Sequence, residues 1–261
     1  MYFFIFAAFP IPSSVLQLLL YQSITIMGSI FKFKEFEVNQ AGCAMKINTD
    51  GVLLGATVVH NQPEYILDIG TGTGVIAMML AQRFPEAQVD AVEIDESAAN
   101  AAINNFANSK FATRSKAYLS PIADYQTARK YDLVVSNPPF FVNDLKNPEI
   151  RKGIARHADE EFFESLVQKV SEILSDQGSF WLILPVKQAE LLVESATKYG
   201  LSLQRRIAIC SDQSRPVIRH IICLSKQKTA AIASENFYIY ESKGIHTSAY
   251  KELLKDFFLA F

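Results

Sequence analysis

Four consecutive residues, Asn137, Pro138, Pro139 and Phe140, carry the groups needed to hold a flat amine. The two prolines fix the backbone, so that the Asn137 amide oxygen and the Pro138 carbonyl oxygen can point at one spot. An NH2 group could donate a hydrogen bond to each oxygen while its ring stacks on Phe140. Such a grip would orient the nitrogen for attack on an electrophile without a strong general base. The alternative interpretation is a strand that simply ends at two prolines.

A second candidate site is the glycine-rich segment DIGTGTG, which begins at Asp68 and contains Gly70, Gly72 and Gly74. Glycines let the backbone approach a ligand closely, and free N–H groups at the start of a helix can face it. Glu93 ends the next apolar run, where its carboxylate could accept hydrogen bonds from ribose hydroxyls. The spacing is not the GxGxxG of dinucleotide binders, so a ligand with an amino-acid end and an adenosine end fits better than a nicotinamide cofactor. A tight turn that packs a helix on a strand is the structural alternative.

Apolar runs alternate with helical patterns around both motifs, and this alternation predicts an α/β fold. Repeated units of this kind imply a parallel sheet that is covered on both faces and binds ligands beyond the carboxyl ends of its strands. The final third differs, because it contains two successive strands that could pair antiparallel. The pattern predicts strands over 64–69, 88–94, 113–119, 131–136, 180–184, 203–210, 217–224 and 237–240, and helices over 75–84, 96–106, 160–175 and 250–258.

The composition is that of a globular protein, with 49% hydrophobic and 20% charged residues in 261. The formal net charge of −2 means that any nucleic-acid binding needs a local basic patch. Three cysteines without a CxxC pair and four histidines without ligand spacing predict a reduced, cytoplasmic protein that holds no metal. No obligate protein partner is evident, and we expect a monomer.

Residues 1–26 do not fit this description, because the first charged residue of the chain is Lys32. The segment lacks the basic start of a signal peptide, and prolines and polar residues interrupt it too often for a membrane span. We therefore expect translation to begin at Met27, with a disordered or interface-seeking leader as the alternative, and no stable membrane association. Residues 27–261 then form one domain, in which 27–60 are an amino-terminal extension on the donor and substrate side.

The combined motifs resemble class I S-adenosylmethionine-dependent N-methyltransferases that carry an NPP-aromatic motif. More closely, the chain is similar to the tRNA(Val) adenine N6-methyltransferases, which modify the adenosine 3′ of the anticodon. The similarity covers about Phe31 to Phe261. Its segments are FKFKEF from Phe31, AMKINTDGVLLG from Ala44, DIGTGTG, VEID, SNPPFF, the loop Arg156-His157-Ala158 and the terminal 250–258.

The resemblance implies a Rossmann-like fold whose mostly parallel, seven-stranded sheet has an antiparallel end strand. It implies S-adenosylmethionine as cofactor, S-adenosylhomocysteine as product, tRNA as partner and no metal. Residues 137–140 would hold the target adenine. The donor site would comprise Asp68, Gly70, Thr71, Gly72, Gly74, Glu93, Ile94 and Asn137.

Lys46, Thr49 and Asp50 would lie beside the donor or the target, although a helix start capped by Thr49 or Asp50 explains the same residues. Two positions depart from the family. Many relatives carry an acid that meets the donor adenine where this chain has Ser120-Pro121, with Asp124 further on, and Asn48 replaces a commoner small residue, which we expect to affect at most a turn. The candidate RNA contacts are Arg156 and His157, then Lys32, Lys34, Lys146, Arg151, Lys152, Arg205 and Arg206.

Related enzymes with the same motif act on guanine N2 or adenine N6 in rRNA, adenine in DNA or a glutamine amide in proteins. The motif alone does not separate these amines. A catalytically silent RNA chaperone that keeps the donor pocket is a further alternative, which the intact Asn137 motif disfavours.

Overall fold

A computed structural model of the chain describes residues 29–43, 45–138 and 148–261, and for residues 148–159 it describes the backbone alone. The leader 1–26, together with Pro139 and Phe140, lies outside the described residues. The strands are β1 (Ile30–Lys32), β2 (Glu37–Asn39), β3 (Tyr65–Ile69), β4 (Gln88–Glu93), β5 (Ser115–Leu119), β6 (Tyr131–Ser136), β7 (Leu174–Leu184), β8 (Ser202–Cys210), β9 (Val217–Ser225), β10 (Ala233–Tyr238), β11 (Tyr240–Ser242) and β12 (Ile245–His246). The helices are α2 (Thr49–Thr57), α3 (Val75–Arg83), α4 (Glu96–Ala107), α5 (Pro148–Ile173), α6 (Val186–Lys198) and α7 (Ser248–Leu254), with a 3-10 turn η1 (Ile122–Asp124).

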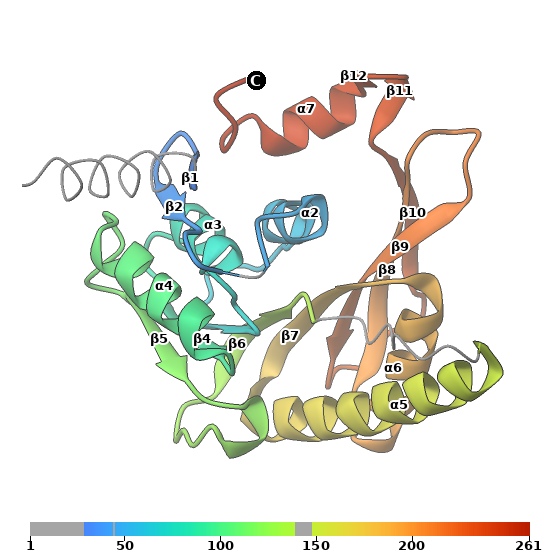
Figure 1. The fold of residues 1–261 in the computed structure, drawn as a ribbon. Coiled ribbons are helices and arrows are strands. Elements are labelled where there is room, and N and C mark those ends of the chain that lie inside the picture. Colours follow the sequence, from blue (N-terminus) through green and yellow to red (C-terminus); the bar gives the residue numbers. More distant parts are fainter. Residues whose placement is uncertain (1–28, 44, 139–147) are drawn as a thin grey trace, which may run out of the picture.

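The central sheet has eight strands in the order β10-β8-β9-β7-β6-β3-β4-β5 (Figure 1). Strand β9 runs antiparallel to both β7 and β8, and every other neighbouring pair is parallel. The predicted mostly parallel α/β sheet with an antiparallel strand near one end is thus confirmed. The strand beyond the expected seven is β10, whose mostly exposed sequence ASENFY lacks the apolar pattern of a buried strand.

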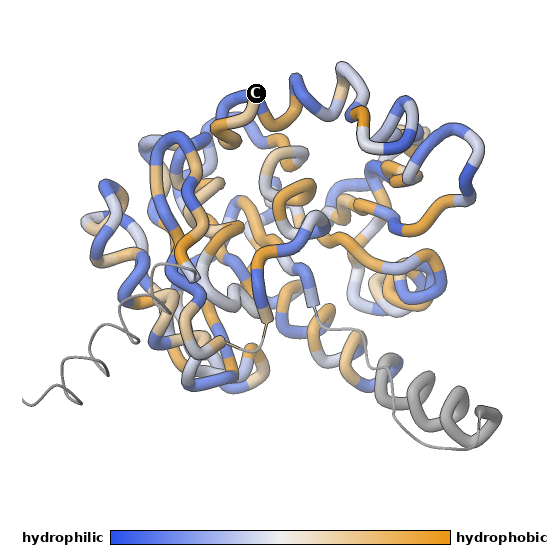
Figure 2. The backbone as a smooth tube through the Cα atoms, turned by 45° about the horizontal axis from the view of Figure 1, so that its top comes forward, coloured by the Kyte–Doolittle hydropathy of each residue, from blue (hydrophilic) through white to orange (hydrophobic). Residues whose placement is uncertain are grey.

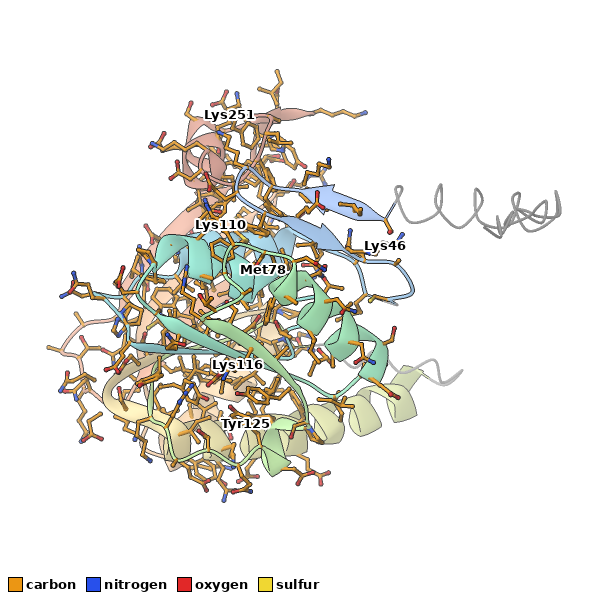
Figure 3. The ribbon with its side chains drawn as sticks, turned by 90° about the vertical axis from the view of Figure 1, so that its left-hand side faces the viewer. Lys46, Met78, Lys110, Lys116, Tyr125 and Lys251 are labelled. Carbon is orange, nitrogen blue, oxygen red and sulfur yellow. The ribbon has the colours of Figure 1, made fainter. Side chains whose placement is uncertain are left out.

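Alternate residues of the sheet face two different helical layers. Ile66 of β3 packs with α2, α3, α4 and α7, whereas its neighbour Leu67 packs with α5 and α6. Figure 3 shows the two layers, with Met78 of α3 on one side of the sheet and Tyr125 beside α5 on the other. This covering of both faces explains why the inner strands are almost continuously apolar. In Figure 2 the hydrophobic stretches lie mainly inside the molecule and the outer turns are hydrophilic.

The carboxyl end of the chain lies above α2, and the β1–β2 hairpin lies beside α3 (Figure 1). Phe33 and Phe36 are buried and stack with ring centroids 4.5 Å apart. The Lys34 backbone N–H donates to the Phe257 carbonyl at 2.8 Å, and its Nζ donates to the Phe261 carbonyl at 2.7 Å. The last residues of the chain therefore bind part of the predicted extension, residues 27–60, through hydrogen bonds.

Helix α5 begins at Pro148, twelve positions before the predicted start at Glu160. Arg156 and His157 consequently lie on a helix, so the prediction that they form a loop is wrong. Helix α6 has no counterpart in the sequence prediction, whereas β8 and β9 occur where they were expected.

Candidate functional site

Residues 70–74 connect β3 to α3 by a turn in which all three glycines have positive φ. The angles are 69° at Gly70, 58° at Gly72 and 89° at Gly74, a region that side chains with a Cβ disfavour. A Cβ at Gly74 would lie 2.6 Å from Phe106 Cε1, whereas nothing lies within 4 Å of a Cβ built at Gly70 or Gly72. Gly74 therefore lets α4 pack against the turn, and the other two glycines leave room for a ligand beside the backbone.

Asp68 lies under this turn and is fully buried. Its Oδ2 accepts hydrogen bonds from Thr71 Oγ1 at 2.5 Å and from the Ala77 backbone N–H at 3.1 Å. Burial raises the pKa of Asp68 to about 7, and the nearby charge of Glu93 adds to the rise. Its second oxygen, Oδ1, is buried and has no hydrogen-bond partner among the described residues. A buried acceptor of this kind costs free energy unless a donor reaches it, so Oδ1 is suited to a ligand N–H group.

Glu93 ends β4 and connects the two turns of the site. One carboxylate oxygen accepts the Gly72 backbone N–H at 2.8 Å, and the other accepts those of Ile94 and Asp95 at 2.8 and 2.9 Å. The oxygen that accepts the Gly72 N–H retains capacity for another donor, whereas the other oxygen already accepts two. The Ile94 residue that follows is 70% exposed.

The motif that ends β6 lies partly within the described residues. Ser136 Oγ donates to the Ile69 carbonyl at 2.9 Å, which joins the ends of β6 and β3. The next residue, Asn137, is half-buried and Pro138 is buried. Asn137 is thereby placed next to the glycine turn, as the sequence predicted from the two strand ends.

The residues predicted beside the donor or target lie around the start of α2. Lys46, in the segment that joins β2 to α2, is exposed (Figure 3). Thr49 is exposed as well. The helix is capped by Asn48, whose Oδ1 accepts the Gly51 N–H at 2.9 Å. The prediction that Thr49 or Asp50 would be the cap is wrong, because these residues already belong to the first turn. The expectation that Asn48 affects at most a turn is also wrong.

One pocket joins the two motifs and this helix start. It is lined by Met45, Lys46, Ile47, Asn48, Gly51, Gly70, Thr71, Gly72, Thr73, Val75, Ile76 and Asn137. The glycine turn and the candidate amine-binding Asn137 thus face a common space, the arrangement needed for transfer of a group between two ligands.

Asp50 makes a contact that the sequence did not reveal. Its Oδ2 accepts from Arg219 Nε at 2.7 Å, and both side chains are mostly shielded from solvent. Arg219 lies on β9, 169 positions away, and only the placement of β9 beside β7 brings it near α2. No local sequence pattern could have identified it.

The departure at Ser120-Pro121 lies at the end of β5, next to the same edge of the sheet. The Ser120 N–H donates to the Glu93 carbonyl at 2.9 Å, and its hydroxyl donates to the Pro121 carbonyl. Asp124 is exposed in the following turn η1. The backbone that follows β5 is therefore joined to Glu93.

For the remaining predicted site residues, the structure describes no side chain in the pocket. Arg156 and His157 lie on α5, where only the backbone is described, and Pro139 and Phe140 lie outside the described residues. Within the described part of the chain no group of three or more His, Cys, Asp or Glu side chains could hold a metal ion. Among the helices of those same residues, none combines the length and apolarity that a bilayer crossing requires.

Comparison with known proteins places the fold and the family. The structure is similar to a predicted O-methyltransferase from Agrobacterium tumefaciens, with a TM-score of 0.62 and 17% identity over 80% of this chain and 96% of that one. This likeness shows the fold alone. The model of the methyltransferase small domain matches residues 43–198.

Two relatives extend the match to nearly the whole chain. A tRNA1(Val) (adenine(37)-N6)-methyltransferase of Pedobacter heparinus is 58% identical over 235 residues, which cover 90% of this chain and 100% of that protein. One of the same name from Dyadobacter fermentans is 36% identical over 88% of this chain and 98% of its own length. The chain therefore belongs to the tRNA1(Val) (adenine(37)-N6)-methyltransferase family.

Proposed function

We propose that this chain transfers the methyl group of S-adenosylmethionine to the N6 atom of adenosine 37 in tRNA1(Val). The observation that carries the proposal is the pocket that Asn137 shares with Gly70 and Gly72. A donor bound along the glycine turn and an amine held by Asn137 would meet in that space. The acceptor is the one for which the relatives are named.

The residues of the donor side fit S-adenosylmethionine. When bound, it supplies a methyl group made electrophilic by the positive sulfonium. Asp68 Oδ1, which has no partner among the described residues, can accept a hydrogen bond from the ammonium group of the donor's amino-acid end. The open space beside Gly70 and Gly72 can admit the part of the donor that lies against the protein backbone. Glu93 can accept from the ribose hydroxyls, and the exposed Ile94 offers an apolar surface to the adenine ring.

The acceptor side is built on the end of β6. Asn137 Oδ1 and the Pro138 carbonyl accept the two N6 protons, which directs the nitrogen lone pair into the pocket. From the sequence motif, Phe140 would be the aromatic residue that stacks on the base. Bound S-adenosylmethionine would supply the methyl group to N6 and leave as S-adenosylhomocysteine, while Asn137 Oδ1 would hold the N6 proton that is then lost to water. Positioning is the main contribution, so the site needs no strong base.

Basic residues of the pocket and of α5 are the candidates for RNA recognition. Lys46 lines it directly, and Lys152, Arg156 and His157 lie near the start of α5, which follows the Asn137 motif. A nucleotide in an anticodon loop is less firmly stacked than one in a duplex, so its extrusion costs less. The unpaired state of Cys43, Cys210 and Cys223, all buried, suits the reducing cytoplasm where tRNA is modified.

The proposal is tested by comparing N137A with the wild-type chain in transfer of labelled methyl to total tRNA. We expect kcat to fall by about 100-fold or more, because the amine loses the acceptor that orients it. Donor affinity measured by calorimetry should stay within about twofold, since Asp68 and Glu93 are untouched. The matched control is N236A on the exposed edge strand β10, which should keep full activity. Full turnover by N137A would refute the assignment.

A further inference from the structure

The side chain of Asn48 contacts that of Asn137. Asn137 Nδ2 lies 3.4 Å from Asn48 Oδ1, and the same Oδ1 accepts the Gly51 backbone N–H at 2.9 Å. A Cβ added at Gly51 would lie 3.5 Å from both atoms, so the three residues meet at one point of the pocket wall. The helix cap and the candidate amine-binding residue are thus adjacent, although 89 positions separate them in sequence.

The chemistry of the three groups determines which way each amide points. The Gly51 N–H can only donate, so the Asn48 atom that faces it must be the oxygen. That oxygen can only accept, and the Asn137 atom that faces it must therefore be the nitrogen. A rotated Asn137 amide would bring two oxygens together. Asn137 Oδ1 is consequently directed away from Asn48.

The position of Asn48 is itself fixed by the core. Helix α2 packs against α3, and Val52, Leu53 and Leu54 in its first turns are buried. As the N-cap of this helix, Asn48 has extended backbone angles of φ −129° and ψ 166°, and its side chain is tied to the helix start. A packed helix thus supplies the rigid support that a loop residue such as Asn137 lacks.

We propose that Asn48 is a positioning residue that selects the amide orientation of Asn137 and keeps Oδ1 available to the target amine. This inference rests on the proposed function, since it needs Asn137 to hold the reacting nitrogen. Asn48 acts through Asn137, so its effect belongs to the methyl-transfer step and not to donor binding.

The test compares N48S with N48D. Serine keeps an N-cap oxygen but is too short to reach Asn137, whereas aspartate keeps an acceptor for both partners. With N48S we expect kcat on tRNA to fall about three- to tenfold, the effect of one lost neutral hydrogen bond, while KM and donor affinity stay the same. N48D should recover most of that loss.

A stability control separates positioning from capping. T247A removes the cap of α7, where Thr247 Oγ1 accepts the Tyr250 N–H at 3.0 Å and makes no contact with Asn137. It should lower the melting temperature and leave kcat unchanged, whereas N48S should lower kcat and leave the melting temperature nearly unchanged. Equal kcat values for N48S and the wild type, or equal losses in N48S and N48D, would overturn the inference and leave the proposed function standing. A wild-type chain that transfers no methyl to tRNA would overturn both.

Discussion

The Glu93 carboxylate at the end of β4 accepts the Gly72 backbone N–H at 2.8 Å and so holds the turn that follows β3. The other carboxylate oxygen accepts two N–H groups of its own strand end, at Ile94 and Asp95. One side chain therefore organises the backbone on both sides of the proposed donor site. This makes Glu93 a support of the turn as well as a candidate partner of the ribose.

We expect E93Q to weaken donor binding. The amide has no charge and a single acceptor oxygen in place of two, so the backbone N–H groups that face one of the carboxylate oxygens would face an NH2 group instead. Loss of a charge-assisted hydrogen bond predicts a rise in the Kd for S-adenosylmethionine of about 10- to 100-fold by calorimetry. E194Q, the same change at an exposed position of α6, should bind the donor as the wild type does. An unchanged Kd in E93Q would show that Glu93 has no part in the site.

We predict that Asp68 makes the free energy of unfolding depend on pH. Its pKa is raised to about 7 in the folded chain from an ordinary value of 3.8, so between these pH values the folded state holds one proton more than the unfolded state. The free energy of unfolding must therefore fall as the pH rises through this interval and level off above about 7. D68N, whose oxygen can still accept from Thr71 and Ala77, removes this titration.

The measurement is the free energy of unfolding in urea of the wild type and of D68N, at roughly pH 5.5, 6.5 and 7.5. The stability of D68N relative to the wild type should increase with pH, by at most about 1.4 kcal/mol per unit, and change little above pH 7. A difference that is independent of pH would mean that Asp68 is already charged in the folded protein at the lowest pH.

We predict that alanine at Gly74 lowers the stability more than alanine at Gly244, a glycine of similar conformation. G74A and G244A both place a Cβ at positive φ, 89° and 80°, and share a cost of about 1–2 kcal/mol. Only at Gly74 does that Cβ meet a side chain, Phe106, whereas nothing lies within 4 Å at Gly244. Overpacking should add about 1–3 kcal/mol to the loss in G74A, measured by urea unfolding. Equal losses would show that α4 moves away without cost.

We predict that the Asp50–Arg219 ion pair couples α2 to β9 energetically. Both side chains are partly shielded from solvent and Nε to Oδ2 is 2.7 Å, so the two charges stabilise each other. A double-mutant cycle with D50N and R219Q should give a coupling free energy of about 1 kcal/mol. The coupling should decrease in high salt, because ions screen a pair that water can still reach. Additive effects of the two substitutions would contradict the pair.

The central half of the fold was predictable because its signals are local. Strands β3, β4 and β6 are short apolar runs, and the two motifs follow strand ends directly, so their meeting at one edge of the sheet could be expected. The pairing of Asp50 with Arg219 and of Asn48 with Asn137 could not, because each depends on how distant elements pack. Strand β10 was predicted only in part, over 237–240, because it is an exposed edge strand whose first residues do not need the apolar pattern of buried strands.

The start of α2 shows how a local rule can select the wrong residue. Asn48, Thr49 and Asp50 are all good N-cap types, and the sequence alone does not say which of them has extended backbone angles. The buried face of α2 decides, because Val52, Leu53 and Leu54 must point into the core and this fixes where the helix begins. The correct cap is also the residue that contacts Asn137.

The measurement that tests the central claim most directly is the mass of each nucleoside in tRNA1(Val) after incubation with the wild-type chain and labelled S-adenosylmethionine. The tRNA is transcribed without modifications, in one form with adenosine and in another with guanosine at position 37, and is digested with nucleases before mass spectrometry. We predict labelled N6-methyladenosine at position 37 of the first transcript and no label in the second. Label at another position, or label only when rRNA or protein replaces the tRNA, would contradict the proposed function.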